Sequence, residues 1–240
     1  MRKEKVEIKK LGINGEGIGY IDRKICFVEG ALPGEIVEVE IVSTNPKYYK
    51  GRLVSCLESS PYRVKSICKE DKFCQGCAFT NYAYNQQLPY KKGVLKDALK
   101  KFTDFDVEAL PIQPTVEAKS RRGYRHVVEL PVAYFKGKVN VGIYQRESKY
   151  LTLMSGCPMQ DPLINECLVK IENILNEYKV RDYNDKVKKG MRFLKIRNID
   201  GQIQIVFVTG EDGLSQDVIE AVSQIQKYLL YNQYNTSSRI

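Results

Sequence analysis

The stretch GINGEGIGYIDRKICFVEGALPGEIVEVEI, residues 12–41, contains short runs of Val, Ile, Tyr and Phe that are separated by glycine-containing turns. The β-branched and aromatic residues favour strands, and the Gly, Asn and Pro residues between them favour turns. Runs of the same kind occur at residues 6–11 and 50–58. We therefore expect five short strands that form a small β-barrel of the OB type over residues 1–60.

Barrels of this type often bind single-stranded nucleic acid, because exposed aromatic rings stack on bases and a basic groove follows the phosphates. The predicted barrel contains side chains of both kinds. The candidates for such contacts are Tyr20, Phe27, Lys47, Tyr48, Tyr49, Lys50 and Arg52.

The composition bounds the class of protein. The chain has 240 residues, 43% of them hydrophobic, which is enough for one large domain or two small ones. It contains no run of about 18 apolar residues that would span a membrane. Its first ten residues, MRKEKVEIKK, lack the apolar core of a secretory signal. We expect a cytoplasmic protein, in which seven cysteines indicate metal binding or catalysis rather than disulfides.

The net charge of +9 is concentrated in the middle of the chain. Residues 61–150 carry 17 Lys and Arg against 9 Asp and Glu. Residues 1–60 carry 10 against 9, and residues 151–240 carry 11 against 11. A localised basic region is typical of a polyanion-binding surface, although a solubilising charge on an ordinary protein explains it equally well.

Residues 61–240 combine helical and strand patterns, which predicts an α+β domain with a mixed or antiparallel sheet. Residues 81–102 predict a lysine-rich helix whose regular part starts at Pro89, and residues 161–178 predict an amphipathic helix with Asp161 as its N-cap. Asp200-Gly201 predicts the turn of a hairpin. The helix at 81–102 is expected to bury Leu88, Leu95, Leu99 and Phe102. Further strands are expected at residues 125–135, 138–145 and 151–154, and a third helix at residues 215–229.

Three cysteines lie close together in ICKEDKFCQGCAF, residues 67–79, with the spacing C-x5-C-x2-C. Thiolates are the usual ligands of zinc and of iron–sulfur clusters, and both sites need a fourth ligand. Cys157 is the strongest candidate, because it lies in a Gly-Cys-Pro loop between a strand and a helix. The other candidates, for which a core or surface position is favoured, are Cys26, Cys56, His126 and Cys167.

Three close cysteines and one distant cysteine suit a cubane iron–sulfur cluster better than a zinc ribbon, which pairs two close C-x2-C motifs. Two alternatives remain open. One is a structural zinc site, and the other is a thiol redox site at Cys74 and Cys77. The redox site is disfavoured, because the preceding segment KEDKF does not resemble the strand that normally precedes such a motif.

Several segments resemble the SAM-dependent RNA uracil-5-methyltransferases of the 23S rRNA type, which carry an N-terminal TRAM domain. Residues 12–41 resemble that TRAM domain, and CKEDKFCQGC with YAYNQQLPYKK resembles the family's cluster loop and helix. GYRHVVELPV resembles a strand of its central domain, and VGIYQRES with CPMQDPLIN resembles the region of its fourth cysteine. The resemblance implies a [4Fe–4S] cluster on Cys68, Cys74, Cys77 and Cys157.

The resemblance also implies binding of RNA, of the 23S rRNA type, by the barrel and the basic middle third. The residues expected to contact RNA are Lys47, Lys50, Arg52, Lys91, Lys92, Arg121, Arg122, Tyr124 and Arg125. The central domain is expected to cover residues 61–240 and to be incomplete at its C-terminal end.

The family transfers the methyl group of S-adenosylmethionine in a C-terminal Rossmann-like domain with a cysteine nucleophile. Because the sequence stops at TSSRI, we expect this domain to be missing, no catalytic residue to be present, and the chain to be a truncated RNA-binding portion that is inactive alone. SAM would then be bound only by a full-length enzyme. The alternative expectation is a stand-alone RNA-binding protein with a structural iron–sulfur or zinc site.

Overall fold

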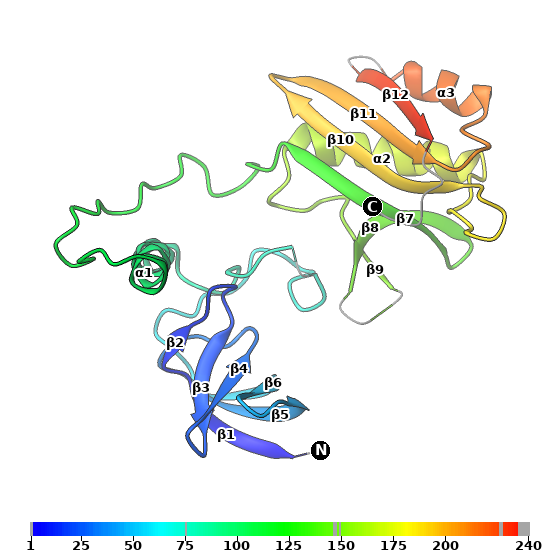
Figure 1. Cartoon of the computed structure of the whole chain (residues 1–240). Helices are drawn as coiled ribbons and strands as arrows, with labels where there is room; N and C mark the ends of the chain where they lie inside the picture. Colours follow the sequence, from blue (N-terminus) through cyan, green and yellow to red (C-terminus); the bar gives the residue numbers. More distant parts are fainter. Residues whose placement is uncertain (1, 75, 146–147, 149, 226–227, 235–240) are drawn as a thin grey trace. The chain divides into compact units, whose positions relative to one another are not determined.

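A computed structural model describes residues 2–74, 76–145, 148, 150–225 and 228–234 (Figure 1). The chain divides into two compact units. The first, which we call the barrel unit, comprises residues 1–67 and 77–118; the second, the sheet unit, comprises residues 68–76 and 119–240. The two units therefore meet at other positions in the sequence than the predicted domain boundary between residues 60 and 61. That domain boundary stays a prediction.

The barrel unit contains a six-stranded, strongly twisted sheet with the strand order β1-β5-β6-β4-β3-β2 (Figure 1). Its neighbours are antiparallel except β4 and β6, which run parallel. Alternate side chains, among them Val6, Cys26, Val28 and Val39, are fully buried in one core. The strands are β1 (Lys3–Glu7), β2 (Lys10–Leu11), β3 (Gly17–Ile21), β4 (Lys24–Val28), β5 (Ile36–Thr44) and β6 (Tyr48–Glu58).

Helix α1 (Tyr84–Phe102) also belongs to the barrel unit, and it begins five residues before the predicted start. Pro89 is tolerated inside it, and the side-chain amide of Gln87 fastens the first turn by donating to the carbonyls of Phe79 (3.2 Å) and Tyr82 (2.8 Å). The predicted apolar stripe is wrong in part, since Leu95 is 48% exposed and Phe102 is 76% exposed. The reason is that the helix packs through its N-terminal half, where Tyr90 lies against the cluster of Leu11, Leu32 and Tyr82.

The sheet unit contains a second six-stranded sheet with the order β12-β11-β10-β7-β8-β9. All neighbours are antiparallel except β11 and β12, which are parallel. Asp200 and Gly201 both have positive φ, 49° and 86°, which confirms the predicted two-residue turn between β10 and β11. The strands are β7 (Val127–Phe135), β8 (Lys138–Tyr144), β9 (Leu151–Leu153), β10 (Met191–Ile199), β11 (Gln202–Thr209) and β12 (Tyr228–Tyr234).

Helices α2 (Pro162–Glu177) and α3 (Gln216–Ser223) pack against this sheet and share its core (Figure 1). Asp161 is the N-cap of α2, as predicted, and accepts a hydrogen bond from the backbone N–H of Leu163 at 2.8 Å. Helix α3 is shorter than the predicted helix over residues 215–229, because Tyr228 already begins β12 beside β11. Among the described residues, no helix is long and apolar enough to cross a membrane.

Candidate nucleic-acid interface and cysteine site

Three neighbouring strands of the barrel unit present aromatic and basic side chains on one face. In the β3-β4-β6 register, Ile25 lies opposite both Tyr20 and Tyr48, and Phe27 lies opposite Lys50. Directly opposite residues project to the same face of a sheet. We call Tyr20, Phe27, Tyr48 and Lys50 the aromatic face.

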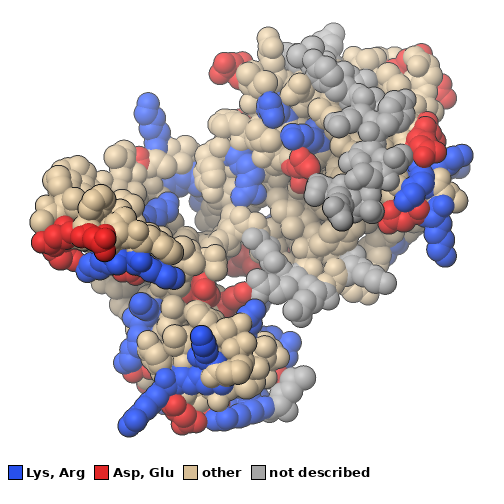
Figure 2. Space-filling view, viewed as in Figure 1, with Lys and Arg blue, Asp and Glu red and all other residues tan. Residues whose placement is uncertain are grey.

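The rings of this face remain accessible. The centroids of Phe27 and Tyr48 are 5.5 Å apart in an edge-to-face arrangement, and Tyr20 is 50% exposed. The intervening residue Cys26 points to the opposite side and is fully buried. The alternation therefore separates a core face from a face that offers stacking surfaces and a positive charge. Figure 2 shows that Lys and Arg cover much of the visible surface of the barrel unit, at the bottom of the view.

The other barrel candidates have different roles. Lys47 is exposed in the turn before β6. Arg52 continues the side of β6 that carries Lys50, but its Nε donates to Oε2 of Glu40 at 3.0 Å, so this charge is compensated. Tyr49 does not join the aromatic face: its ring packs partly into the core, with Nζ of Lys24 4.0 Å from the ring centroid.

The lysines of α1 also differ from one another. Lys96 and Lys100 both form ion pairs with Glu108 at 2.8 Å. Hydrogen bonds from Lys100 and Lys96 lower the pKa of Glu108 to about 2. The two predicted contact residues, Lys91 and Lys92, lie one to two turns earlier on α1, exposed and half-buried respectively.

The remaining predicted RNA contacts lie in the sheet unit. Arg121, Arg122 and Tyr124 are exposed in the segment before β7. Arg125 instead reaches the cysteine loop, where its Nη2 donates to the carbonyl of Gly76 at 3.0 Å. A side chain at Gly76 would lie between the Cys74 sulfur and this guanidinium, 3.3 Å from the first and 3.6 Å from the second. Arg125 therefore ties the loop to the segment that precedes β7, in addition to any contact with RNA.

Three of the four predicted cluster ligands, Cys68, Cys74 and Cys157, lie in the sheet unit, whereas Cys77 begins the next segment of the barrel unit. Cys74 and Cys157 are half-buried against the core of the sheet unit. The pKa of Cys68 is raised first by burial and also by the charges of Cys157 and Cys74. An all-thiol donor set of this kind fits an iron–sulfur cluster in its chemistry.

This arrangement falls short of an assembled site. Among the described residues, there is no group of three or more His, Cys, Asp and Glu side chains placed to hold a metal ion. The three cysteines outside the predicted ligand set lie elsewhere in the structure. Cys26 and Cys167 are fully buried in the two cores, and burial raises their pKa to about 11 and about 12. Cys56 is exposed, so the prediction of a core position for it is wrong.

The loop that carries Cys157 is held by a side chain that the sequence pattern did not single out. Oδ1 of Asn165 accepts from the backbone N–H of Gly156 (3.1 Å) and from the amide of Gln160 (2.9 Å). Its Nδ2 donates to the carbonyl of Cys157 at 3.0 Å. A sequence signal for this role exists: Asn165 is an amide residue in the first turn of the helix that follows the Gly-Cys-Pro loop.

Gly142 allows strand β8 to lie unusually close to strand β9, which precedes the Cys157 loop. A Cβ atom at Gly142 would lie 2.2 Å from the carbonyl oxygen of Thr152, which is too short for any side chain. Only glycine therefore permits the β8–β9 pairing of Gly142 with Leu153, four residues before Cys157.

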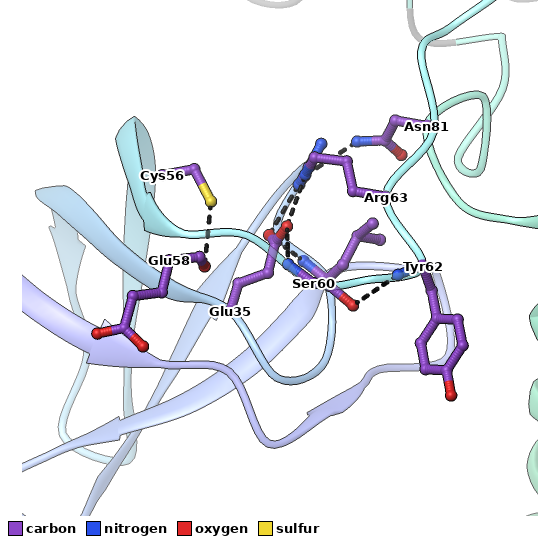
Figure 3. Close-up of polar contacts among 9 residues, drawn as sticks. Glu35, Cys56, Glu58, Ser60, Tyr62, Arg63 and Asn81 are labelled. Atoms are coloured by element: carbon purple, nitrogen blue, oxygen red, sulfur yellow. Dashed lines mark hydrogen bonds and ion pairs between the residues drawn. The ribbon is translucent and has the colours of Figure 1, made fainter.

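The barrel unit contains a buried ion pair that fastens the segment after β6 (Figure 3). Glu35 is fully buried, and its carboxylate accepts from Nε and Nη2 of Arg63 at 2.6 and 2.8 Å. It also accepts from the backbone N–H groups of Leu32 (2.8 Å) and Ser60 (3.3 Å). Arg63 and Asn81 both donate to the carbonyl of Gly30, at 2.7 and 3.1 Å. We call these contacts the Glu35 clasp.

Comparisons with known proteins relate this geometry to a class of enzymes. Residues 2–54 match the TRAM domain family. The chain is 31% identical to an uncharacterized RNA methyltransferase of Streptococcus pyogenes serotype M3, over 98% of this chain and 53% of the relative. It is 34% identical to an uncharacterized RNA methyltransferase of Enterococcus faecalis, over 85% of this chain and 45% of the relative. The chain thus spans about half the length of the curated relatives it matches.

A solved structure has the same fold. The tRNA (uracil-54, C5)-methyltransferase of Pyrococcus abyssi, in complex with S-adenosyl-L-homocysteine, superposes with a TM-score of 0.71 at 22% identity. The match covers 98% of this chain and 52% of that protein.

These comparisons correct two expectations drawn from the sequence. The chain is not a stand-alone RNA-binding protein of another class, because 98% of it aligns with RNA methyltransferases. The expectation of a catalytically lacking fragment, with the SAM-binding domain absent, is contradicted by the match of nearly the whole chain to a methyltransferase structure. That expectation rested on the last residues of the sequence, and a chain end carries no physical information about the rest of a protein.

Residues 2–54 are thus similar to the TRAM domain family, and the chain as a whole is similar to RNA methyltransferases over nearly its entire length.

Proposed function

We propose that the protein acts in SAM-dependent methylation of RNA at C5 of uracil, and that the residues described above bind the RNA. The similarity to RNA methyltransferases and the fold shared with a uracil-C5 enzyme support the reaction. The single observation that carries the RNA-binding role is the aromatic face, because exposed rings beside a lysine suit unpaired bases and their phosphates. We assign no residue of this chain to the methyl-transfer step.

We propose 23S rRNA as the substrate, on the basis of the sequence resemblance, with tRNA as the competing candidate. The tRNA alternative is favoured by the relative of known structure, which acts on uracil 54 of tRNA. The bases that these enzymes modify must leave their stacks, so the substrate is expected to be a loop rather than a regular duplex.

The test is transfer of a radiolabelled methyl group from SAM, with the protein as expressed from its own gene. Unmodified 23S rRNA and unmodified tRNA transcripts are supplied separately, and the labelled nucleoside is identified after digestion. We expect 5-methyluridine in the rRNA. Label in the tRNA alone contradicts the rRNA assignment, and label in neither RNA contradicts the proposed reaction.

The aromatic face gives a binding prediction. Replacing Tyr20 by alanine removes a half-exposed ring from the face, and loss of one base–aromatic stack costs about 1–3 kcal/mol. We expect the affinity for a short single-stranded RNA to fall by about 5- to 150-fold, measured by fluorescence anisotropy at fixed salt. Tyr62, which is 45% exposed in the same unit but outside this face, provides the matched control Tyr62→Ala. Equal losses in both variants would remove the aromatic face from the proposal.

We also propose that Cys68, Cys74, Cys77 and Cys157 hold a [4Fe–4S] cluster. The protein is proposed to act in the cytoplasm, where such thiols stay reduced. Support comes from the C-x5-C-x2-C spacing and from the influence of Cys157 and Cys74 on the pKa of Cys68. When bound, such a cluster would supply four metal–sulfur bonds that hold the cysteine loop to the Cys157 loop. The hydrogen bonds of Arg125 and Asn165 orient those two loops.

A further inference from the structure

The barrel unit contains a pocket that none of the functions above uses. It has a volume of about 290 Å³ and lies between the segment that includes β2 and the first half of helix α1. Its mouth is reached from solvent, because Lys9, Lys10, Pro89 and Asp97 are exposed. The pocket is lined by Lys9, Lys10, Leu11, Pro33, Tyr82, Gln86, Pro89, Tyr90, Gly93, Val94 and Asp97.

The lining combines a fixed apolar surface with separated polar groups. Tyr90 is held in place, since its hydroxyl donates to the carbonyl of Gly12 at 2.5 Å and its ring meets that of Phe79 edge to face at 5.1 Å. Leu11 and Tyr82 belong to the same cluster and are almost fully buried. The two lysines stand on the β2 side of the pocket, and Gln86 and Asp97 stand on the helix side.

Gly93 is the unusual member of the lining. It lies in the middle of α1, where glycine is the least favourable residue after proline. A Cβ atom at this position would meet no other atom of the described residues within 4 Å, so none of them requires glycine there. Glycine at position 93 is explained if a ligand approaches the backbone of the helix closely at this point, because a side chain there would block the approach.

We propose that this pocket binds one nucleotide of single-stranded RNA. The base lies on the apolar surface against Gly93, and Lys10 contacts its phosphate. Lys9 is already ion-paired with Glu7. The carboxylate of Asp97 and the amide oxygen of Gln86 accept hydrogen bonds from N–H groups at the edge of the base. A phosphate has no such N–H groups to donate. The volume lies just below the range of ligand pockets, about 300–1,000 Å³, so the pocket has no room for more than one nucleotide.

This inference rests on the proposed RNA-binding function and adds a contact on β2, where Lys10 lies opposite Ile18 of β3. A protein partner would require a larger apolar surface than this pocket offers. The charge of Lys10 favours a polyanion, since a cation that neutralises a phosphate releases a condensed counterion.

The test fills the pocket at Gly93 in the full chain. Gly93→Leu places a branched side chain in the space where the base would lie, whereas Gly93→Ala adds only a methyl group. Both substitutions favour the helix over glycine, so both variants are expected to fold. Circular dichroism melts verify this before binding is measured with a labelled ten-nucleotide single-stranded RNA.

We expect Gly93→Leu to bind this RNA about tenfold more weakly than Gly93→Ala, as for loss of one stacked base. Lys10→Gln should lower the slope of log affinity against log salt by about 0.7, the value for one phosphate contact with a single strand. Equal affinities of the two Gly93 variants, with RNA binding otherwise intact, would overturn the pocket proposal alone. Failure of the unaltered protein to bind any RNA would instead overturn the proposed function.

Discussion

Replacing Glu35 by alanine is expected to lower the free energy of unfolding of the protein by about 3–5 kcal/mol. The substitution leaves the Arg63 guanidinium half-buried without its carboxylate and leaves the backbone N–H groups of Leu32 and Ser60 without their acceptor. Unfolding by urea, followed by circular dichroism, measures the change. Because total stabilities are about 5–15 kcal/mol, this single change removes a large share of the stability.

A matched surface pair provides the control. Glu40 pairs with Arg52 on the same sheet, but the Arg52 side chain is 64% exposed, and exposed pairs contribute about 0–1 kcal/mol. Glu40→Ala should therefore leave the urea midpoint almost unchanged. The double variant Glu35→Leu with Arg63→Met removes both charges and should recover much of the loss. Glu35→Ala and Glu40→Ala variants of equal stability would mean that the clasp is not a stabilising feature.

The clasp also predicts how stability depends on pH. Burial alone would raise the pKa of Glu35, but the hydrogen bond from Arg63, the backbone N–H of Leu32 and the charge of Arg63 together hold it below its ordinary value of 4.5. The unfolded state then binds the proton more readily than the folded state, so this contribution is fully present above pH 4.5 and is lost as the pH falls through the lower, folded-state pKa. Urea midpoints of the unaltered protein and of Glu35→Gln should converge as the pH is lowered below 4.5. Midpoints that keep a constant difference down to pH 3 would contradict this assignment.

The clasp illustrates what the sequence could not predict. Glu35 and Arg63 are 28 residues apart, and nothing in the turn before β5 or the segment after β6 marks them as partners. Features set by neighbouring residues were predictable. The Asp200-Gly201 turn needs only backbone freedom at two positions, and the cap at Asp161 needs only a carboxylate one residue before Pro162.

Packing between distant elements explains the other differences. The amphipathic pattern of α1 predicted a buried stripe, but the aromatic cluster around Tyr90 determines where the helix touches the barrel, and this leaves Phe102 exposed. The aromatic face depends on register: the sequence offered Tyr48 and Tyr49 as equal candidates, and the parallel pairing of β4 with β6 turned Tyr48 outward and Tyr49 toward the core. The cysteine spacing, a local feature, identified the candidate ligands, whereas Asn165 required the three-dimensional loop.

Replacing Cys157 by serine is expected to reduce the iron and acid-labile sulfide content from about four of each per chain to near zero, in protein purified without oxygen. A cubane cluster needs four thiolates, and a serine hydroxyl at one corner does not hold the iron as a thiolate does. Iron, sulfide and zinc are measured on the same samples, and the visible absorption of the cluster is recorded as an independent signal.

The matched control is Cys56→Ser, because Cys56 is an exposed thiol outside the proposed ligand set and should leave the iron content unchanged. Serine at position 157 keeps the backbone carbonyl that accepts from Asn165, so the loop should keep its hydrogen bonds and the variant its secondary structure. About one zinc per chain and no sulfide would retain the four-cysteine site but reject the cluster. A folded protein with neither metal would mean that the three close cysteines serve another purpose, and Arg125 and Asn165 would then stabilise these loops for the binding of RNA alone.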